Sequence, residues 1–223
     1  LCEDPNELKN LIDEDFESGL GSFTENNINI NPVNAPIPDP NISSQWKPQT
    51  SVHVPSANVW YPAISSGFGP NNFVMTNGDA NIDLAAGEFI ENELVSTVFD
   101  TSNYLDLTLD LEMYFSRYNA IIPEYVNIEL STDGGVTYPI IIDNITEDVG
   151  YGTKFNLLTY DLSAYIGLPN LRIRIHYFGE WGDGVAVDNI KLYGTTAINP
   201  LAIWSQPPGV QIYEDPTALI PYT

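Results

Sequence analysis

Asp188 stands in an apolar run near the C-terminal end of the chain, where its carboxylate needs a partner. Within residues 182–192, alternate positions of an extended strand share one face, which would place Asp188 beside Ala186 and Ile190. A buried carboxylate is very costly unless it has a cation, hydrogen-bond donors or a β-bulge that turns it outward. Only 7 Lys and Arg residues accompany 30 Asp and Glu residues, so the sequence predicts a structural metal site here rather than a catalytic one.

Two other segments are rich in the oxygen ligands that calcium prefers. Asp13, Asp15 and Glu17 share one face if residues 12–17 form a strand, so they are either a solvated row or part of a cation site. The turn at residues 76–83 is dense in Asn and Asp but lacks the spacing and closing Glu of an EF-hand. Taken alone, neither segment specifies a metal site.

A row of cationic side chains is predicted on a third segment. Arg172, Arg174 and His176 alternate with apolar residues along residues 171–178, so they share the polar face of a strand. They form either an anion-binding stripe or cross-strand pairs with acidic residues of neighbouring strands. We favour the pairs, because opposite charges facing one another across strands stabilise a sheet.

The sequence offers little for catalysis. His53 and His176 are the only histidines, neither has zinc-type spacing, and no Gly-flanked nucleophile elbow is present. Residues 131–138 match a single Asp-box, which specifies a hairpin rather than an activity. Glu14 and Glu17 would lie on opposite faces of a strand, unlike the paired carboxylates of retaining glycosidases. We therefore expect no catalytic residues and no enzyme activity.

The elements that position these residues are strands. Residues 105–116 alternate strictly between apolar and polar side chains, which predicts one buried and one solvated face, and residues 126–131 and 171–178 follow the same pattern. Shorter strands are predicted at residues 12–17, 59–62, 73–76, 93–99, 137–142, 155–161 and 185–193. About ten strands with turns between them indicate an all-β fold, a two-sheet antiparallel β-sandwich.

The chain divides into three parts on these patterns. Asp4, Pro5 and Glu7 are typical of a helix start, which predicts a short helix within an N-terminal segment, residues 1–11. Residues 12–194 form the sandwich domain. Residues 195–223, rich in proline, are expected to be a linker and the start of a following module.

Composition limits the partners. The formal charge of −23 argues against binding to nucleic acid or anionic membranes, which requires basic patches. No run of about 18 apolar residues is present, so no membrane insertion is expected. Cys2 is the only cysteine, which excludes an internal disulfide and is unlike small disulfide-rich secreted modules.

Several motifs, read in order, resemble a known extracellular family, the MAM-like and reelin-subrepeat-like jelly rolls, and most closely the bacterial choice-of-anchor J domains. The resemblance covers residues 12–194. It depends on the order and spacing of the segments at residues 15–19, Trp60, 73–78, 93–96, 105–116, 131–135, 160–163 and 182–192. The paired cysteines of MAM domains are absent, which favours the bacterial branch.

The resemblance implies a jelly roll with one structural calcium ion that bridges the first strand, a loop and the last strand. The calcium ligands that it implies are Asp188, Glu17 or Asp15, and Asn77 or Asp79. It also implies an Ig-like module at residues 195–223, and a place in secreted surface adhesins of gliding bacteria that use type IX secretion.

We therefore expect a non-catalytic extracellular or cell-surface domain that serves adhesion or ligand binding, with surface glycans or other cell-surface proteins as partners. The alternative is a carbohydrate-binding accessory module of a secreted hydrolase. Four aromatic residues, Trp60, Tyr61, Tyr151 and Trp181, could stack on sugar rings, although packing in the core or in loops explains each of them equally well.

Overall fold

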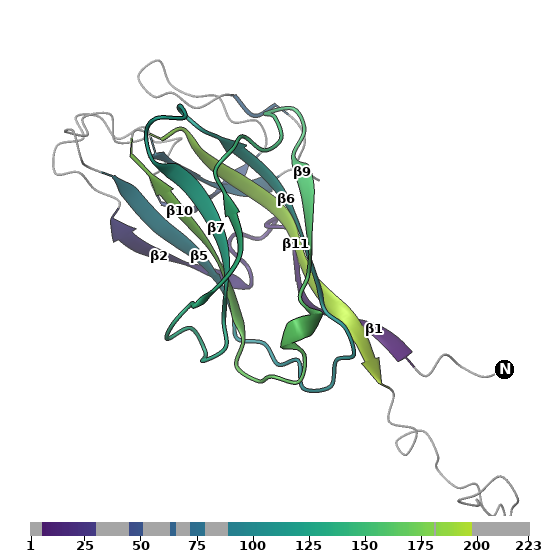
Figure 1. The fold of residues 1–223 in the computed structure, drawn as a ribbon. Coiled ribbons are helices and arrows are strands. Elements are labelled where there is room, and N and C mark those ends of the chain that lie inside the picture. Colours follow the sequence, from purple (N-terminus) through teal and green to yellow (C-terminus); the bar gives the residue numbers. More distant parts are fainter. Residues whose placement is uncertain are drawn as a thin grey trace, which may run out of the picture.

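Two antiparallel sheets face each other in a β-sandwich (Figure 1). The computed structural model describes residues 6–29, 45–50, 63–65, 72–78, 89–180 and 182–197. Sheet A contains β1 Asn6–Glu14, β3 Lys47–Thr50, β4 Asn72–Asn77, β6 Thr108–Ser116, β9 Asn156–Asp161 and β11 Gly184–Ala197. Sheet B contains β2 Phe23–Asn29, β5 Ile90–Ser96, β7 Glu124–Ser131, β8 Ile140–Ile145 and β10 Arg172–Gly179. The prediction of an all-β antiparallel sandwich is confirmed, and helical structure in these ranges is limited to turns such as η2 Ser163–Tyr165.

The long strand β11 organises sheet A. It runs beside β6 on one side, while on the other side its first half pairs with β4 and its second half with β1. In Figure 1, β1 and the end of β11 extend together beyond the rest of the sandwich as a two-stranded ribbon. The pairing runs as far as Asn6 and Ala197, so the sheet extends beyond both predicted limits of the domain.

The predicted N-terminal helix is wrong for residues 6–11, which belong to β1. The apolar residues Leu8, Leu11 and Ile12 could have supported two helical turns at most, and such short helices are marginal without packing. Pairing with β11 instead gives this backbone a full ladder of hydrogen bonds.

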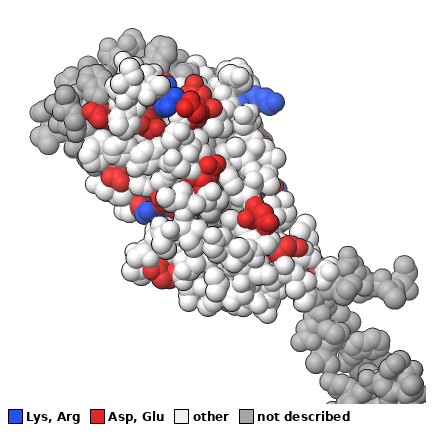
Figure 2. All heavy atoms as spheres, viewed as in Figure 1, with Lys and Arg blue, Asp and Glu red and all other residues white. Residues whose placement is uncertain are grey.

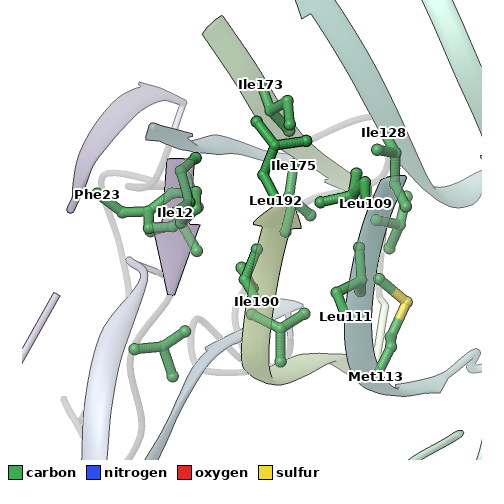
Figure 3. Packing of buried hydrophobic residues seen from close by; sticks show 14 of the residues in the cluster. Ile12, Phe23, Leu109, Leu111, Met113, Ile128, Ile173, Ile175, Ile190 and Leu192 are labelled. Carbon is green, nitrogen blue, oxygen red and sulfur yellow. The ribbon is translucent and has the colours of Figure 1, made fainter. Parts of the chain in front are cut away.

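The core lies between the sheets, where side chains from both inner faces meet (Figure 3). The alternation along residues 105–116 is confirmed from position 107 onwards, although Leu105 itself is 51% exposed. The inward side chains of β6 and its approach are Leu107, Leu109, Leu111, Met113 and Phe115, all fully buried. Strands β7 and β10 contribute Val126, Ile128, Leu130, Ile173, Ile175 and Tyr177 to the same cluster.

A second, smaller apolar cluster covers part of the outer face of sheet A. It consists of Ile64, Phe73, Met75, Tyr114, Phe155 and Ala186. Ala186 faces Met75 on one neighbouring strand and Tyr114 on the other. Strand β4 and the first half of β11 are consequently buried on both faces, which alternation alone does not indicate.

A β-bulge in β11 overturns the predicted orientation of Asp188. The pairing with β6 shifts between Asp188 and Lys191, and Asn189 adopts a positive φ of 48°. Val187 and Ile190 both join the inner core, whereas Ala186 belongs to the outer cluster. Asp188 therefore does not share a face with Ile190, because the bulge inserts one residue and reverses the alternation.

The remaining predictions divide simply. The strands predicted at residues 73–76, 93–99, 137–142, 155–161 and 185–193 overlap β4, β5, β8, β9 and β11. The Asp-box forms the turn between β7 and β8. The strand predicted at residues 59–62 and the Ig-like module predicted within residues 195–223 lie, apart from residues 195–197 of β11, outside the described residues.

Candidate functional site

Two of the predicted calcium ligands border the same junction in sheet A, where β1 ends and β4 begins along β11. Asp188 is fully buried, and its oxygens accept hydrogen bonds from the main-chain N–H of Asn189 at 2.8 Å and from its side-chain amide at 3.2 Å. Glu17 accepts a hydrogen bond from the main-chain N–H of Asn72, the first residue of β4, at 2.7 Å. The topology thus places both carboxylates at one point, as the resemblance implies.

The other predicted ligands are not brought to this junction. Asp15 is exposed, and its carboxylate accepts a hydrogen bond from Glu17 N–H at 3.1 Å. Asn77 pairs with Gly184, four positions from Asp188 and so about 13 Å along the strand. The buried side-chain amide of Asn77 has no hydrogen-bond partner among the described residues. Asp79 lies outside those residues.

Calcium itself stays a prediction. Within the described ranges, no group of three or more His, Cys, Asp or Glu side chains is arranged to hold a metal ion. The junction does offer carboxylate oxygens from Asp188 and Glu17, which are the donor type that calcium takes, and their charge suits a divalent cation.

Glu14 is a buried carboxylate that the sequence analysis missed as a structural residue. Its two oxygens accept hydrogen bonds from the main-chain N–H groups of Phe16 at 3.1 Å and Ser22 at 2.6 Å. Gly21 lies so close that a Cβ there would be 1.8 Å from Glu14 Oε2. Glu14 therefore holds the turn that follows β1, and the nearby glycines Gly19 and Gly21 were the available signal for such a turn.

Glu124 is a second buried carboxylate, at the start of β7. It accepts hydrogen bonds from the Tyr177 hydroxyl and from Tyr118 N–H, both at 2.8 Å. Burial raises the pKa of Glu124 to about 8, and the nearby negative charge of Asp183 adds to the shift against these hydrogen bonds. Glu124 therefore binds a proton on folding near neutral pH.

The outward face of sheet B carries the predicted cationic row. The Arg174 guanidinium donates hydrogen bonds to the carboxylates of Glu93 and Glu129, which flank it on β5 and β7. His176 Nε2 lies 2.9 Å from a Glu91 oxygen, and its Nδ1 lies 3.7 Å from Glu129. The prediction of cross-strand pairs is confirmed for Arg174 and His176, with partners on both neighbouring strands.

These ion pairs determine the protonation of the face. Burial opposes the charge on His176, but the hydrogen bonds and negative charges of Glu129 and Glu91 outweigh it, so the pKa of His176 is raised. Burial likewise opposes the charge on Glu129, but His176 and Arg174 outweigh it, so the pKa of Glu129 is lowered. The charged forms are therefore stabilised in pairs.

A groove of about 370 Å³ opens on this face beside the ion pairs. Its lining residues are Thr24, Asn26, Glu93, Val95, Gly135, Val136, Tyr138, Arg172 and Arg174. The Asp-box turn provides one wall through Gly135, Val136 and Tyr138, and the guanidinium of Arg174 lies 4.1 Å from the centre of the Tyr138 ring. The groove thus combines hydrogen-bonding side chains, one aromatic ring and two arginines.

Aromatic rings gather at the other end of the same face. Phe178 stacks on Phe89 at 4.9 Å and on Tyr125 at 5.1 Å between ring centroids. Of the four aromatic residues proposed for sugar stacking, the described ranges include only Tyr151, which is exposed. Trp60, Tyr61 and Trp181 lie outside them. The groove aromatic, Tyr138, was not singled out from the sequence beyond its place in the Asp-box.

The surface is acidic, as composition predicts. Figure 2 shows carboxylates scattered over one face of the molecule with few Lys or Arg side chains between them. No helix within the described ranges is both long and apolar enough to cross a membrane.

Comparison with known proteins adds information on the fold. No family model matches the chain, and no curated protein matches it. A cleaved adhesin domain (K3) of Lys-gingipain from Porphyromonas gingivalis W83 is similar in structure, with a TM-score of 0.51 and 16% identity over 84% of this chain and 99% of that one.

Two other solved structures are more distant. TmCBM61 in complex with beta-1,4-galactotriose has a TM-score of 0.46 at 14% identity, covering 81% of this chain and 94% of that one. A cyclase from Fischerella sp. TAU has a TM-score of 0.49 at 12% identity, covering 86% and 98%. At such identities a likeness shows the fold alone, so the chain shares the β-sandwich fold of the gingipain adhesin domain.

Proposed function

We propose that this chain is a non-catalytic binding domain of a secreted or cell-surface bacterial protein, and that it serves adhesion or ligand binding through the groove on sheet B. The observation that carries the proposal is the groove itself, an open concavity lined by polar side chains on the face of a sheet that is rigidly paired on both sides. Concave sites with a few convergent polar groups are where proteins bind small ligands.

Glycans are the ligand class that this lining supports best. Thr24 and Asn26 present a hydroxyl and an amide, Glu93 presents acceptors, and Tyr138 presents part of a ring. Sugars offer many hydroxyl groups that both donate and accept hydrogen bonds, which matches mixed donors and acceptors around a single aromatic side chain. A peptide partner would be expected to add to a sheet edge, whereas this groove lies on the face.

The second candidate is a carbohydrate-binding accessory module of a secreted hydrolase. The same groove favours it, so the two functions differ in what lies beside this domain in the full-length protein. The likeness in fold to an adhesin domain supports a binding role for this sandwich. A surface-exposed bacterial location, export by the type IX route and a structural calcium ion at the Asp188 junction belong to the same proposal.

A glycan array followed by calorimetry tests the groove. We expect the purified domain to bind a subset of surface glycans, and Asn26→Ala to weaken binding. The matched control is Asn156→Ala, an exposed asparagine on β9 of the opposite sheet. Equal binding by both variants would exclude this groove, and the absence of any bound glycan would contradict the proposed ligand class.

A further inference from the structure

Arg172 differs from the other two arginines of the sequence. Arg117 pairs with Glu147, and Arg174 pairs with Glu93 and Glu129. Arg172 makes no ion pair with any described carboxylate, and its buried Nε has no hydrogen-bond partner there. In a chain of net charge −23, a guanidinium that stays without a carboxylate requires an explanation.

The surroundings of Arg172 explain how it is kept apart from acids. Its cross-strand neighbour on β7 is Ser131, whereas the corresponding neighbour of Arg174 is Glu129. The backbone of Gly135 covers its stem so closely that a Cβ at that position would lie 2.9 Å from Arg172 Cδ. The Asp-box turn thus packs over the aliphatic part of Arg172 and leaves its guanidinium at the groove.

The acid of that turn is occupied elsewhere. The Asp133 carboxylate accepts hydrogen bonds from the N–H groups of Val136 and Thr137, both at 3.0 Å, and from the Thr137 hydroxyl at 2.7 Å. These hydrogen bonds and that of Ser131 lower the pKa of Asp133 well below its usual range. Asp133 therefore stabilises the turn and does not neutralise Arg172.

We propose that the groove selects a glycan that carries a carboxylate, and that Arg172 binds this group. The inference rests on the proposed function and adds the charge of the ligand to it. A guanidinium binds a carboxylate or a sulfate through two parallel hydrogen bonds, and a partly buried Nε–H is one of the donors that such a pair uses. An acidic sugar would supply the acceptor that the described residues do not.

The overall negative charge does not prevent this binding. At physiological ionic strength, charges more than about 8 Å apart are largely screened, so the groups lining the groove dominate. Arg174 is already neutralised by Glu93 and Glu129, which leaves Arg172 as the available cation of the groove.

Matched sugars provide the test. The probes are oligogalacturonate, oligoglucuronate and sialyllactose, each beside its carboxyl-reduced counterpart, with a sulfated galactose oligosaccharide as a separate arm. We expect the domain to bind at least one acidic sugar about tenfold or more tightly than its neutral counterpart, because hydrogen bonds to charged groups contribute about 1.5–3 kcal/mol. Tighter binding of the sulfated sugar alone would show that the anion is a sulfate, and would overturn the assignment of a carboxylate.

Variants then assign the effect to Arg172. Arg172→Gln should lose about tenfold in affinity for the acidic sugar and leave the neutral sugar unchanged, while Arg172→Lys should retain part of the affinity. Arg117→Gln is the matched control and should bind as the wild type. If the neutral sugars bind as tightly as the acidic ones and Arg172→Gln has no effect, the groove remains a glycan site and the inference is wrong. If no sugar binds, both proposals fail.

A measurement that needs no preferred oligosaccharide supports the same decision. Each arginine gives its own Nε–H signal in a two-dimensional nitrogen–proton spectrum, and Arg172→Gln identifies one of them. Titration with glucuronate should shift the Arg172 signal, whereas Arg117 should not respond. Equal shifts at both arginines would show unspecific ion pairing and contradict the proposal.

Discussion

Buried carboxylates are held in two different ways in this molecule. On the outward face of sheet B, Glu129 and Glu93 are paired with the guanidinium of Arg174. At the ends of strands, Glu14 and Glu124 are held by main-chain N–H and hydroxyl donors. The pKa of Glu129 is lowered while that of Glu124 is raised to about 8.

The difference shows what compensates burial. Hydrogen bonds from neutral donors satisfy the oxygens of Glu124 but do not offset its loss of hydration, so its protonated form is favoured. The full positive charges of Arg174 and His176 do offset that loss at Glu129. Cations are scarce in this chain, and two of its three arginines lie on one face, Arg174 and Arg172, where the groove opens.

The largest expected effect comes from removing the shared cation. Arg174→Gln should lower the free energy of unfolding by about 3 kcal/mol, because it leaves Glu93 and Glu129 buried without their partner. Denaturant unfolding measures the loss. Arg117→Gln, which breaks a pair with the exposed Glu147, should cost less than about 1 kcal/mol. Similar losses in the two variants would contradict the contrast between buried and exposed pairs.

A metal ion would be a third way to hold a buried carboxylate, at Asp188. If calcium binds the junction, saturation at 100 times the dissociation constant stabilises the fold by about 2.7 kcal/mol, so a chelator should lower the melting midpoint. Asp188→Ala should abolish this sensitivity, whereas Asp100→Ala, at an exposed turn, should keep it. An unchanged midpoint in excess chelator, with no metal found by elemental analysis, would refute the calcium prediction.

Glu14 tests the carboxylates held by main-chain donors. Glu14→Ala should cost about 2 kcal/mol, because the buried N–H of Phe16 and the N–H of Ser22 lose their acceptor. Asp15→Ala, at the adjacent exposed position, should stay within about 0.5 kcal/mol. If the neighbouring variants are equally stable, the turn after β1 does not depend on Glu14.

The smallest expected effect is a pH dependence from Glu124. A carboxyl whose pKa is raised on folding stabilises the protein fully below its unfolded pKa, and the contribution is lost as the pH rises towards about 8. The melting midpoint should therefore fall by about 2–4 °C between pH 6 and pH 8.5. Glu124→Gln should flatten this slope, leaving the part due to His176, whose raised pKa acts in the same direction. A slope that Glu124→Gln leaves unaltered would assign the dependence to other groups.

The sequence was sufficient wherever a pattern is local. Strict alternation along residues 105–116 identified which side chains of β6 enter the core, since strand geometry leaves only two faces. The Asp-box identified the turn between β7 and β8, and alternation placed Arg172, Arg174 and His176 on one polar face. The sandwich class and the cross-strand pairing of Arg174 and His176 followed from these patterns.

Features that depend on distant contacts required the tertiary structure. The bulge at Asn189 reverses the alternation after Asp188, because β11 exchanges β4 for β1 as its neighbour at that point. Residues 6–11 are a strand because β11 offers them a partner that no local signal announces. The groove at Arg172 likewise arises only when the turn after β7 folds over β10, beside side chains from β2 and β5 that lie far away in the sequence. Local periodicity determines which way a side chain points, whereas which other segment it meets is set by how the strands are ordered in the sheets.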